Sequence, residues 1–507
     1  MRQLTSLDAQ FLALEDARTY GHVGGLAIYD PSSAPGGKVE VADLCRLVAE
    51  RLPMLPVFRW RLAEVPFGLD HPYWVEDPEF DLDFHIRETA VPPPGDEARL
   101  AETCARIFAR PLDRSRPLWE MYLIHGVRGD KIGVLSKIHH ATVDGVSGAE
   151  ILGALLDLSP EGRDRIEQSD QRVPVRRPGQ VEMLARGVAG LPRQPLRALK
   201  SLPKAAGSLP RFPGLGAVPG APTAERLLRG GDVDATEQNA QSAPKLFFNG
   251  KVSAHRRFSF GSLPLESVKR IKNELGIKVN DVVVALCATG LRNWLIEHDA
   301  LPDRPLVALV PVSVRGEDEH GTFGNKVSGM VLPIATDVED PHERLLRTHD
   351  ILKRAKERQQ ALPASLMTDA SNFLPPALFS RASRMAAEVM GRVRPPLNVV
   401  ISNVPGPPVP LYMAGATLAS HYPMSVVTDG VGLNITVMSY RDHLDFGITA
   451  CRDQVDDVWT LFDHMRASLK ELEEVVCGAP EGAAETRGPA TTSGEAAAKR
   501  RRAKAEA

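Results

Sequence analysis

Two adjacent histidines and a nearby carboxylate form the strongest chemical signal in this chain of 507 residues. His139 and His140 are followed by Asp144 and Gly145 within the run 136–148. A neutral imidazole has a pKa near neutrality, so it can accept a proton from an incoming hydroxyl. The pattern indicates acyl transfer with a histidine base, and this chemistry requires no nucleophilic Ser or Cys. A structural alternative stays open, in which the His pair ends a strand and Asp144 caps the next helix.

The residues around the histidines predict a strand, a turn and a helix. β-branched and other apolar residues alternate partly with polar ones over 131–139, which favours a strand, and Trp119 shortly before is expected to anchor the core. Gly145 permits a tight backbone path, and Asp144 and Ser147 offer side-chain oxygens for a helix start. We therefore expect the histidines on a loop between two buried elements. Apolar residues recur at helical spacing after the turn, namely Ile151, Leu152, Leu155 and Leu156.

Metal and nucleic-acid chemistry are both disfavoured. A zinc site requires three or four ligands, and the chain has neither a spaced His-Glu-x-x-His nor a Cys-x-x-Cys pair. The formal net charge of −3 gives no overall attraction to nucleic acid, and no nucleic-acid-binding motif is found. We expect no metal, no other cofactor and no nucleic-acid partner.

Length and composition fit a large intracellular enzyme. A chain of 507 residues exceeds what one core usually serves, so two domains are expected, and 43% hydrophobic residues suffice for both cores. Five scattered cysteines argue against a disulfide framework and for a reducing compartment. Residues 1–16 lack the pattern of a signal peptide. The best apolar runs, 282–291 and 306–314, are shorter than the roughly 20 residues that span a bilayer, so any membrane contact is expected to be peripheral.

The chain is predicted to divide into four segments. An N-terminal domain with the histidine motif occupies 1–160, and a C-terminal domain of alternating strands and helices occupies 250–477. A basic linker rich in Pro and Gly joins them over 161–249. The tail over 478–507 is rich in Ala, Gly, Glu and Thr and is expected to be disordered, because it cannot bury a core. No internal repeat is detectable in the sequence.

The linker combines cations with spaced apolar residues. From Arg172 to Leu215 it carries nine basic residues and one acid, Glu182. Its prolines prevent one long helix, so at best short amphipathic pieces form. Two interpretations stay open, a solvated crossover between domains and a membrane-surface segment. The apolar residues that interleave with the cations are Met183, Leu184, Val188, Leu191, Leu196, Leu199 and Leu202.

Polar residues of the second half are candidates for supporting roles. Asn280 and Asp281 precede the apolar run 282–291, and either could cap a buried helix. Arg315 follows an apolar strand, where an Arg usually pairs with a carboxylate for structure. Asn403 lies before closely spaced prolines that are expected to shape a rigid loop.

These motifs together resemble one family, the bacterial wax ester synthases/diacylglycerol acyltransferases. The His-His-x-x-x-Asp-Gly run at 139–145 and Pro-Leu-Trp at 117–119 carry the resemblance, which extends to about residue 475 apart from the linker. Chloramphenicol acetyltransferase-like enzymes, plant acyltransferases and condensation domains share the histidine run. They continue the motif Asp-Phe-Gly as Trp-Gly, whereas 445–447 continues as Ile-Thr, which favours the lipid branch. The other matching segments are 7–12, 22–25, 279–282, 311–315, 324–325 and 402–407.

The resemblance implies a fold and a reaction. The fold is the chloramphenicol acetyltransferase-like α/β architecture, with two similar domains, each a mixed β-sheet with helices, and an active-site tunnel at the domain interface. The reaction is acyl transfer from long-chain acyl-CoA, a co-substrate, to diacylglycerol or, in a wax ester synthase, to a fatty alcohol. We expect a cytoplasmic enzyme held peripherally at the inner membrane face or at lipid droplets. A third possibility is a catalytically weak lipid-binding relative, and the intact histidine run argues against it.

The resemblance also implies roles for individual residues. His140 would act as base and then as acid, and His139 would support the loop. Asp144 would point away from the substrate and hold the turn through an ion pair beside Gly145. The amide of Asn280 would donate a hydrogen bond to a developing oxyanion. The residues implied beside the channel are Asn280, Asp281, Arg315 and Asn403.

Overall fold

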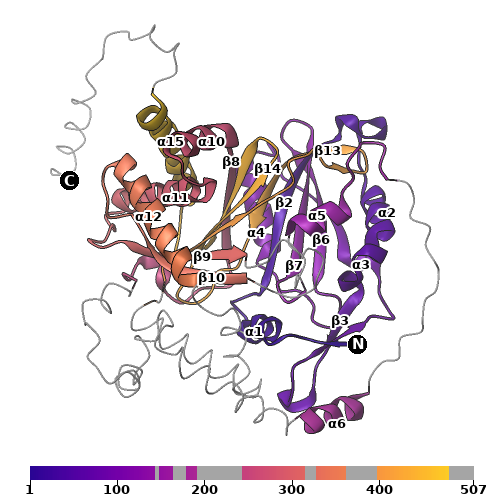
Figure 1. The fold of residues 1–507 in the computed structure, drawn as a ribbon. Coiled ribbons are helices and arrows are strands. Elements are labelled where there is room, and N and C mark those ends of the chain that lie inside the picture. Colours follow the sequence, from indigo (N-terminus) through magenta and orange to yellow (C-terminus); the bar gives the residue numbers. More distant parts are fainter. Residues whose placement is uncertain are drawn as a thin grey trace, which may run out of the picture.

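The computed structural model describes residues 1–142, 148–163, 179–190, 243–313, 327–360, 395 and 397–478. Figure 1 shows two halves that lie side by side, each with a β-sheet at its centre. The first half runs from indigo to magenta in the figure and includes the N-terminus. Its helices and strands are β1 (Arg2–Gln3), α1 (Ser6–Leu14), β2 (His22–Asp30), α2 (Val41–Arg51), β3 (Trp60–Ala63), β4 (Tyr73–Glu76), α3 (Leu82–His85), β5 (Ile86–Ala90), α4 (Glu97–Phe108), β6 (Trp119–Val127), β7 (Lys131–His139), α5 (Gly148–Leu155) and α6 (Gln180–Gly190).

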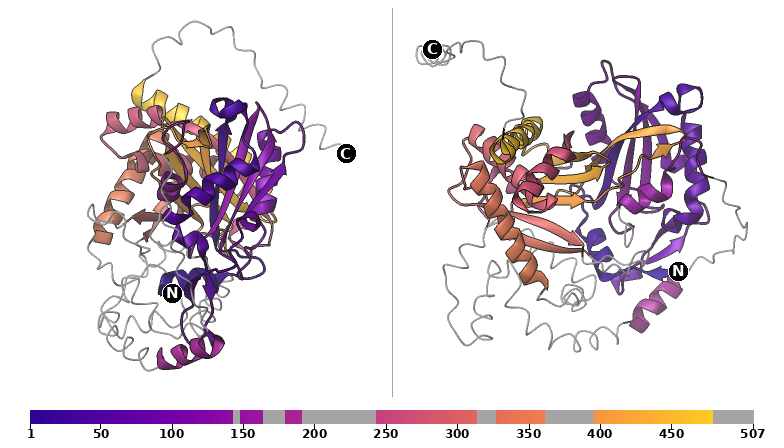
Figure 2. Two further views of the ribbon diagram at one scale, coloured as in Figure 1. Left: turned by 90° about the vertical axis from the view of Figure 1, so that its right-hand side faces the viewer. Right: turned by 45° about the horizontal axis from the view of Figure 1, so that its top comes forward.

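The second half places its long helices on the outer side of its sheet, away from the first half, as both views of Figure 2 show. This arrangement leaves the opposite face of the sheet directed toward the first half. The elements of the second half are β8 (Arg256–Pro264), α10 (Leu265–Leu275), α11 (Val279–Glu297), β9 (Leu306–Ser313), β10 (Val327–Ile334), α12 (Pro341–Gln360), β11 (Val399–Val404), β12 (Tyr412–Met413), β13 (Ala416–Met424), β14 (Leu433–Tyr440), β15 (His443–Cys451) and α15 (Trp459–Cys477).

The first large sheet has six strands in the order β12-β13-β2-β7-β6-β5. β7 lies near the centre, antiparallel to β2 and to β6, while β5 runs parallel to β6. β7 spans Lys131–His139, so the predicted strand before the histidines is confirmed. Trp119 at the start of β6 is fully buried and its indole Nε1 donates to the carbonyl of Phe58 at 2.7 Å, which confirms it as a core anchor.

The second large sheet repeats part of this arrangement. Its order is β10-β9-β11-β14-β15-β8. β11 runs parallel to β14, β14 antiparallel to β15, and β15 antiparallel to β8. The first sheet has the same succession, since β5 runs parallel to β6, β6 antiparallel to β7, and β7 antiparallel to β2. The prediction of two similar α/β domains with mixed sheets is therefore confirmed.

A crossover joins the two halves, and the segment boundaries predicted from the sequence do not include it. β12 and β13 belong by sequence to the segment 250–477, yet β13 pairs antiparallel with β2 and extends the first sheet. Figure 1 shows this connection reaching from the second half across the top of the first. The reason is that β2 would otherwise be an edge strand with unpaired backbone groups, and β13 satisfies them.

The described parts of the predicted linker, 161–249, pack against the domains. Met183 of α6 is only 3% exposed, and α6 contacts the 3-10 turn Pro66–Gly68. Leu246 and Phe248 join the core of the second half, so that half begins several residues before position 250. The rest of the linker, and the tail beyond Gly478, lie outside the described residues.

Helix α11 is the one described helix that is long and apolar enough to cross a bilayer, with a mean hydropathy of 1.2. It is 72% buried over that window, and residues 282–288 are almost fully enclosed. They share one apolar core with the strands of the second sheet and with α15. All five cysteines are free, as expected.

Candidate active site

The end of β7 places the two histidines at a tight turn. His139 is the last residue of β7 and pairs with His22, the first residue of β2. The His139 amide donates to the carbonyl of Leu118 at 2.9 Å, and the His140 amide donates to the carbonyl of Gly21 at 2.8 Å. These bonds hold the turn against both neighbouring strands, so the two histidines lie where β7 ends.

His139 is held from two sides. Its side chain is 1% exposed, and its Nδ1 accepts a hydrogen bond from the Ala141 amide at 3.1 Å. Its Nε2 lies 3.1 Å from Oε1 of Glu15. Because Nδ1 accepts this hydrogen bond, a ring proton belongs on Nε2, which faces the Glu15 carboxylate.

Glu15 is a member of the site that the sequence analysis missed. Its Oε1 accepts from the Gly21 amide at 2.7 Å, and Oε2 accepts from Nη2 of Arg114 at 2.6 Å. Burial works to raise the pKa of this carboxyl, but bonding to His139, Gly21 and Arg114 prevails and lowers it to about 2. Glu15 is therefore a carboxylate at neutral pH. No local pattern relates it to residues more than a hundred positions away, and only its place three residues after the matched segment 7–12 hinted at it.

His140 is partly enclosed by an aromatic ring. Phe11 of α1 stacks on its imidazole, with ring centroids 3.9 Å apart and an interplanar angle of 15°. Burial, followed by the charge interaction with His139, lowers the pKa of His140 to about 4, although a bond to its own backbone acts in the opposite direction. The ring is consequently neutral at pH 7, which is the state that a proton acceptor requires.

Three of the residues predicted for the site cannot be placed. Asp144, Gly145 and Arg315 lie outside the described residues. The ion pair expected of Asp144 and the role expected of Arg315 therefore stay predictions.

The predicted residues of the second half take two different positions. Nδ2 of Asn403 on β11 donates to Oδ1 of Asn280 on α11 at 3.2 Å, so these two residues lie together. This leaves the Nδ2 amide of Asn280 as its available donor. Asp281 is buried instead at the start of α11, where Oδ2 accepts from the Lys278 amide at 3.0 Å and lies 2.7 Å from Nδ1 of His349. These contacts give Asp281 the capping role that was considered for it.

A buried charged group lies behind the histidines on β7. Lys137 is fully buried, and its Nζ donates to the carbonyl of Arg110 at 2.7 Å and lies 3.5 Å from Glu120. Burial lowers the pKa of Lys137 to about 8, and the nearby Glu120 opposes that shift. Lys137, Glu120 and His22 are all buried, so polar side chains lie in the interior near the end of β7 that carries the histidines.

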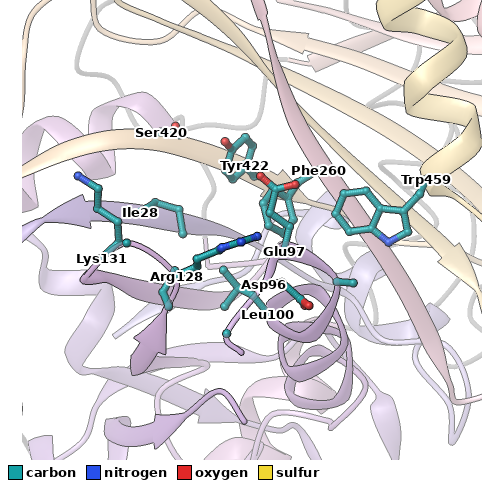
Figure 3. Close-up of a pocket in the computed structure, with 14 residues that line it drawn as sticks. Ile28, Asp96, Glu97, Leu100, Arg128, Lys131, Phe260, Ser420, Tyr422 and Trp459 are labelled. Carbon is teal, nitrogen blue, oxygen red and sulfur yellow. The ribbon is translucent and has the colours of Figure 1, made fainter. Parts of the chain in front are cut away.

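A hollow of about 620 Å³ lies at the opposite end of β7. Figure 3 shows Phe260, Tyr422 and Trp459 on one side and Arg128 and Glu97 reaching across it. The residues that line it include Lys131, at the start of β7, but neither histidine. It is distinct from the histidine site, and the tunnel that the resemblance implies beside the histidines stays a prediction. Within the described ranges, no cluster of three or more His, Cys, Asp or Glu side chains is suited to hold a metal ion.

A neutral histidine directly after a central strand, in a molecule of two like α/β halves, suits the proton transfer that acyltransferases with a histidine base require. The family models make the assignment specific. Residues 4–283 match the wax ester synthase/diacylglycerol acyltransferase catalytic domain, and residues 323–473 match the C-terminal domain of the same family. The chain belongs to the wax ester synthase/diacylglycerol acyltransferase family and is an acyltransferase.

Curated relatives agree over nearly the whole length. A putative diacylglycerol O-acyltransferase of Mycobacterium tuberculosis strain CDC 1551 is 36% identical over 486 residues, which is 95% of this chain and 92% of that protein. A probable diacylglycerol O-acyltransferase of strain H37Rv, tgs2, is 34% identical over 475 residues, covering 92% of this chain and 98% of that protein.

Solved structures support the same fold. The wax ester synthase/diacylglycerol acyltransferase of Marinobacter aquaeolei VT8 aligns with a TM-score of 0.65 and 30% identity, over 94% of this chain and 100% of that one. The first condensation domain of the calcium-dependent antibiotic synthetase aligns with a TM-score of 0.55 and 17% identity, over 94% and 96% of the two chains. This second likeness concerns the fold alone.

Proposed function

We propose that this protein transfers a long-chain acyl group from acyl-CoA to the free hydroxyl of diacylglycerol, which yields triacylglycerol. The observation that carries the proposal is a neutral His140 at the turn after β7, in a chain whose curated relatives are named diacylglycerol O-acyltransferases. Membership of the family supplies the reaction class, and the turn supplies a group able to move the proton.

The chemical step needs one residue to act as base and then as acid. The acceptor hydroxyl attacks the thioester carbonyl while His140 takes up its proton. A C–O bond forms, the C–S bond breaks, and His140 returns the proton to the departing CoA thiolate. No acyl-enzyme forms, because both substrates are bound together. The Asn280 amide, whose oxygen is occupied by Asn403, is placed in this proposal as the donor to the oxyanion.

A second candidate is wax ester synthesis from a fatty alcohol. The likeness to the Marinobacter enzyme, whose name covers both activities, favours keeping it. The two reactions share the base and the donor and differ only in the acceptor. Purified protein should therefore be given acyl-CoA with diacylglycerol and with hexadecanol in parallel. Faster formation of triacylglycerol supports the proposal, wax ester alone supports the alternative, and no ester in either assay indicates a lipid-binding relative.

We also propose that the protein associates peripherally with a membrane or lipid-droplet surface on the cytoplasmic side. Its proposed acceptors are apolar, and the linker carries the basic and apolar residues that suit an anionic interface. Helix α6 supports this reading because Val181 is 81% exposed and Arg186 is on the surface, while Met183 fixes the helix to the first half.

A further inference from the structure

Helix α1 contacts both histidines, and the proposed reaction does not account for it. Phe11 stacks on His140, and Glu15, which directly follows the helix, bonds to His139. One short helix near the N-terminus therefore reaches the two residues of the catalytic turn. Figure 1 shows α1 below the end of β7, at the boundary between the halves.

The helix is firmly anchored to the structure that carries the turn. Thr5 and Asp8 form a capping box at its start. Leu12 is buried in a small apolar cluster that also contains Ala141, the residue directly after the histidine pair. Arg114 donates to the carbonyl of Leu12 at 2.7 Å as well as to Glu15. The position of α1 and the position of the turn are thus fixed together.

Glu15 determines which histidine can serve as the base. Its carboxylate faces Nε2 of His139, while the Ala141 amide occupies Nδ1. Nδ1 of His139 is therefore occupied as an acceptor, and Nε2 lies beside a carboxylate that favours a proton on it. A ring held in this way has no free lone pair for a substrate proton, so proton transfer is left to His140.

Phe11 determines how His140 is oriented. A stack at 3.9 Å with nearly parallel planes covers one face of the imidazole. Rotation of the ring about its Cβ–Cγ bond would drive it into Phe11, so the plane of the base is held. The same contact keeps water from that face and contributes to the burial that lowers the pKa of His140.

We propose that α1 is a positioning element of the active site, in which Phe11 fixes the plane of the His140 ring and Glu15 holds His139 as the Nε2–H tautomer. Neither residue touches the reacting atoms in this account. The inference rests on the proposed function, since it takes His140 as the base.

The first test is Phe11→Leu, which keeps an apolar side chain but removes the flat stacking surface. We expect kcat to fall about tenfold while KM for acyl-CoA changes by less than about twofold. The acid limb of the kcat/KM profile should move up toward pH 6.5, the ordinary pKa of His, because the ring becomes better solvated. Phe247→Leu is the matched control, since Phe247 stacks on His298 in the second half at 5.9 Å.

The second test separates hydrogen bonding from charge at Glu15. Glu15→Gln keeps an oxygen that accepts from His139 and Gly21, so it should retain most of kcat. Glu15→Ala removes the acceptor and should lower kcat about tenfold or more. Asp30→Asn is the control, because Asp30 on β2 pairs with Lys131 on β7 at the end of these strands that lies far from the histidines. Circular dichroism and melting temperature establish that each variant is folded.

The outcomes distinguish this inference from the proposed function. Wild-type kcat and pH profile in Phe11→Leu overturn the positioning role, and so does an equal loss in the Phe247 control. If Glu15→Ala is not recovered folded, the Phe11→Leu pH profile decides alone. The proposed function fails separately if His140→Ala is active, whatever the α1 variants do.

Discussion

The ends of β7 and β15 are built by the same backbone bonds but carry different chemistry. Each strand is the third of four in the repeated arrangement, and each ends in a turn before a helix. In both turns, the amide of the last strand residue donates to the carbonyl just before one neighbouring strand. The amide of the next residue donates to the carbonyl just before the other neighbouring strand. The amide three residues after the strand end donates back to the carbonyl of the last strand residue. After β7 the bonds are His139 N to Leu118 O at 2.9 Å, His140 N to Gly21 O at 2.8 Å and Thr142 N to His139 O at 2.8 Å. After β15 they are Cys451 N to Gly432 O at 2.8 Å, Arg452 N to His255 O at 3.2 Å and Gln454 N to Cys451 O at 3.1 Å.

The side chains on the two turns differ completely. Where the first turn carries His139 and His140, the second carries a buried Cys451 and an exposed Arg452. The first turn is also covered by α1, which supplies Phe11 and an ionised carboxylate. The fold therefore provides the turn twice, and the side chains and the helix that distinguish one copy make it the candidate acyl-transfer site.

The largest expected effect is the loss of the base. His140→Ala should lower turnover by about two to four orders of magnitude, because His140 is the proposed proton acceptor and the neighbouring His139 is held by Ala141 and faces Glu15. Arg452→Ala, at the equivalent position after β15, should leave turnover unchanged. Acyl transfer by purified, folded protein measures both.

Near-normal activity in the His140 variant would contradict the mechanism. A comparable loss in both variants would show that the two turns share a structural role rather than differing in chemistry. His139→Ala should cost less than His140→Ala, because His139 is engaged by Glu15 and Ala141.

A smaller loss is expected from crowding the first turn. A Cβ on Gly21 would lie 2.7 Å from Nε2 of His139, whose ring has little room to move aside because it is buried, accepts from the Ala141 amide at Nδ1 and faces Glu15 at Nε2. Gly21→Ala should lower kcat about 10- to 100-fold and destabilise the fold by about 1–3 kcal/mol. Gly153→Ala in α5 meets no atom within 4 Å and serves as the control, measured by activity and thermal melting. Full activity of Gly21→Ala would disprove the tight fit.

The pKa values of two histidines, one in each half, are shifted in opposite directions. Burial lowers the pKa of His140 to about 4, whereas a hydrogen bond to Asp445 is the main reason that the pKa of His443 on β15 is raised. Activity should therefore stay level as pH falls from 7 and decline only near pH 4, where His140 becomes protonated. His443→Gln should not move that acid limb. The kcat/KM profile, with circular dichroism to exclude acid unfolding, tests this, and an acid limb near 6.5 would refute it.

The strand that ends in the first turn was predictable from local pattern. β7 has the expected bounds, and Trp119 and the helix from Val279 are buried as expected. The repeated strand arrangement left no trace in the sequence, because backbone hydrogen bonds impose almost no side-chain identity. The pairing of β13 with β2 was equally hidden, since it joins segments almost four hundred residues apart.

The residues that contact the two histidines were not predictable either, because these contacts also join segments far apart in the sequence. Glu15 reaches His139 through a fold that brings α1 under the end of β7, and no periodicity encodes that contact. Asp281 shows the reverse case, since its place before an apolar run was enough to predict a helix cap. Local pattern thus predicts a strand or a helix cap, whereas the contacts of α1 with the two histidines require tertiary structure.

The smallest expected effect on catalysis comes from the segment between the two halves. Replacing Arg186, Arg193, Arg197, Lys200 and Lys204 by Gln should weaken sedimentation with anionic liposomes, because each cation near such a surface contributes about 1 kcal/mol, an attraction that salt screens. Transfer to a short, water-soluble alcohol should be spared, since the base is on a separate turn. Removing the tail beyond Gly478 should matter less, because its cations lack apolar partners. Unchanged liposome binding by the five-fold variant would leave this segment as a solvated crossover that only connects the two halves.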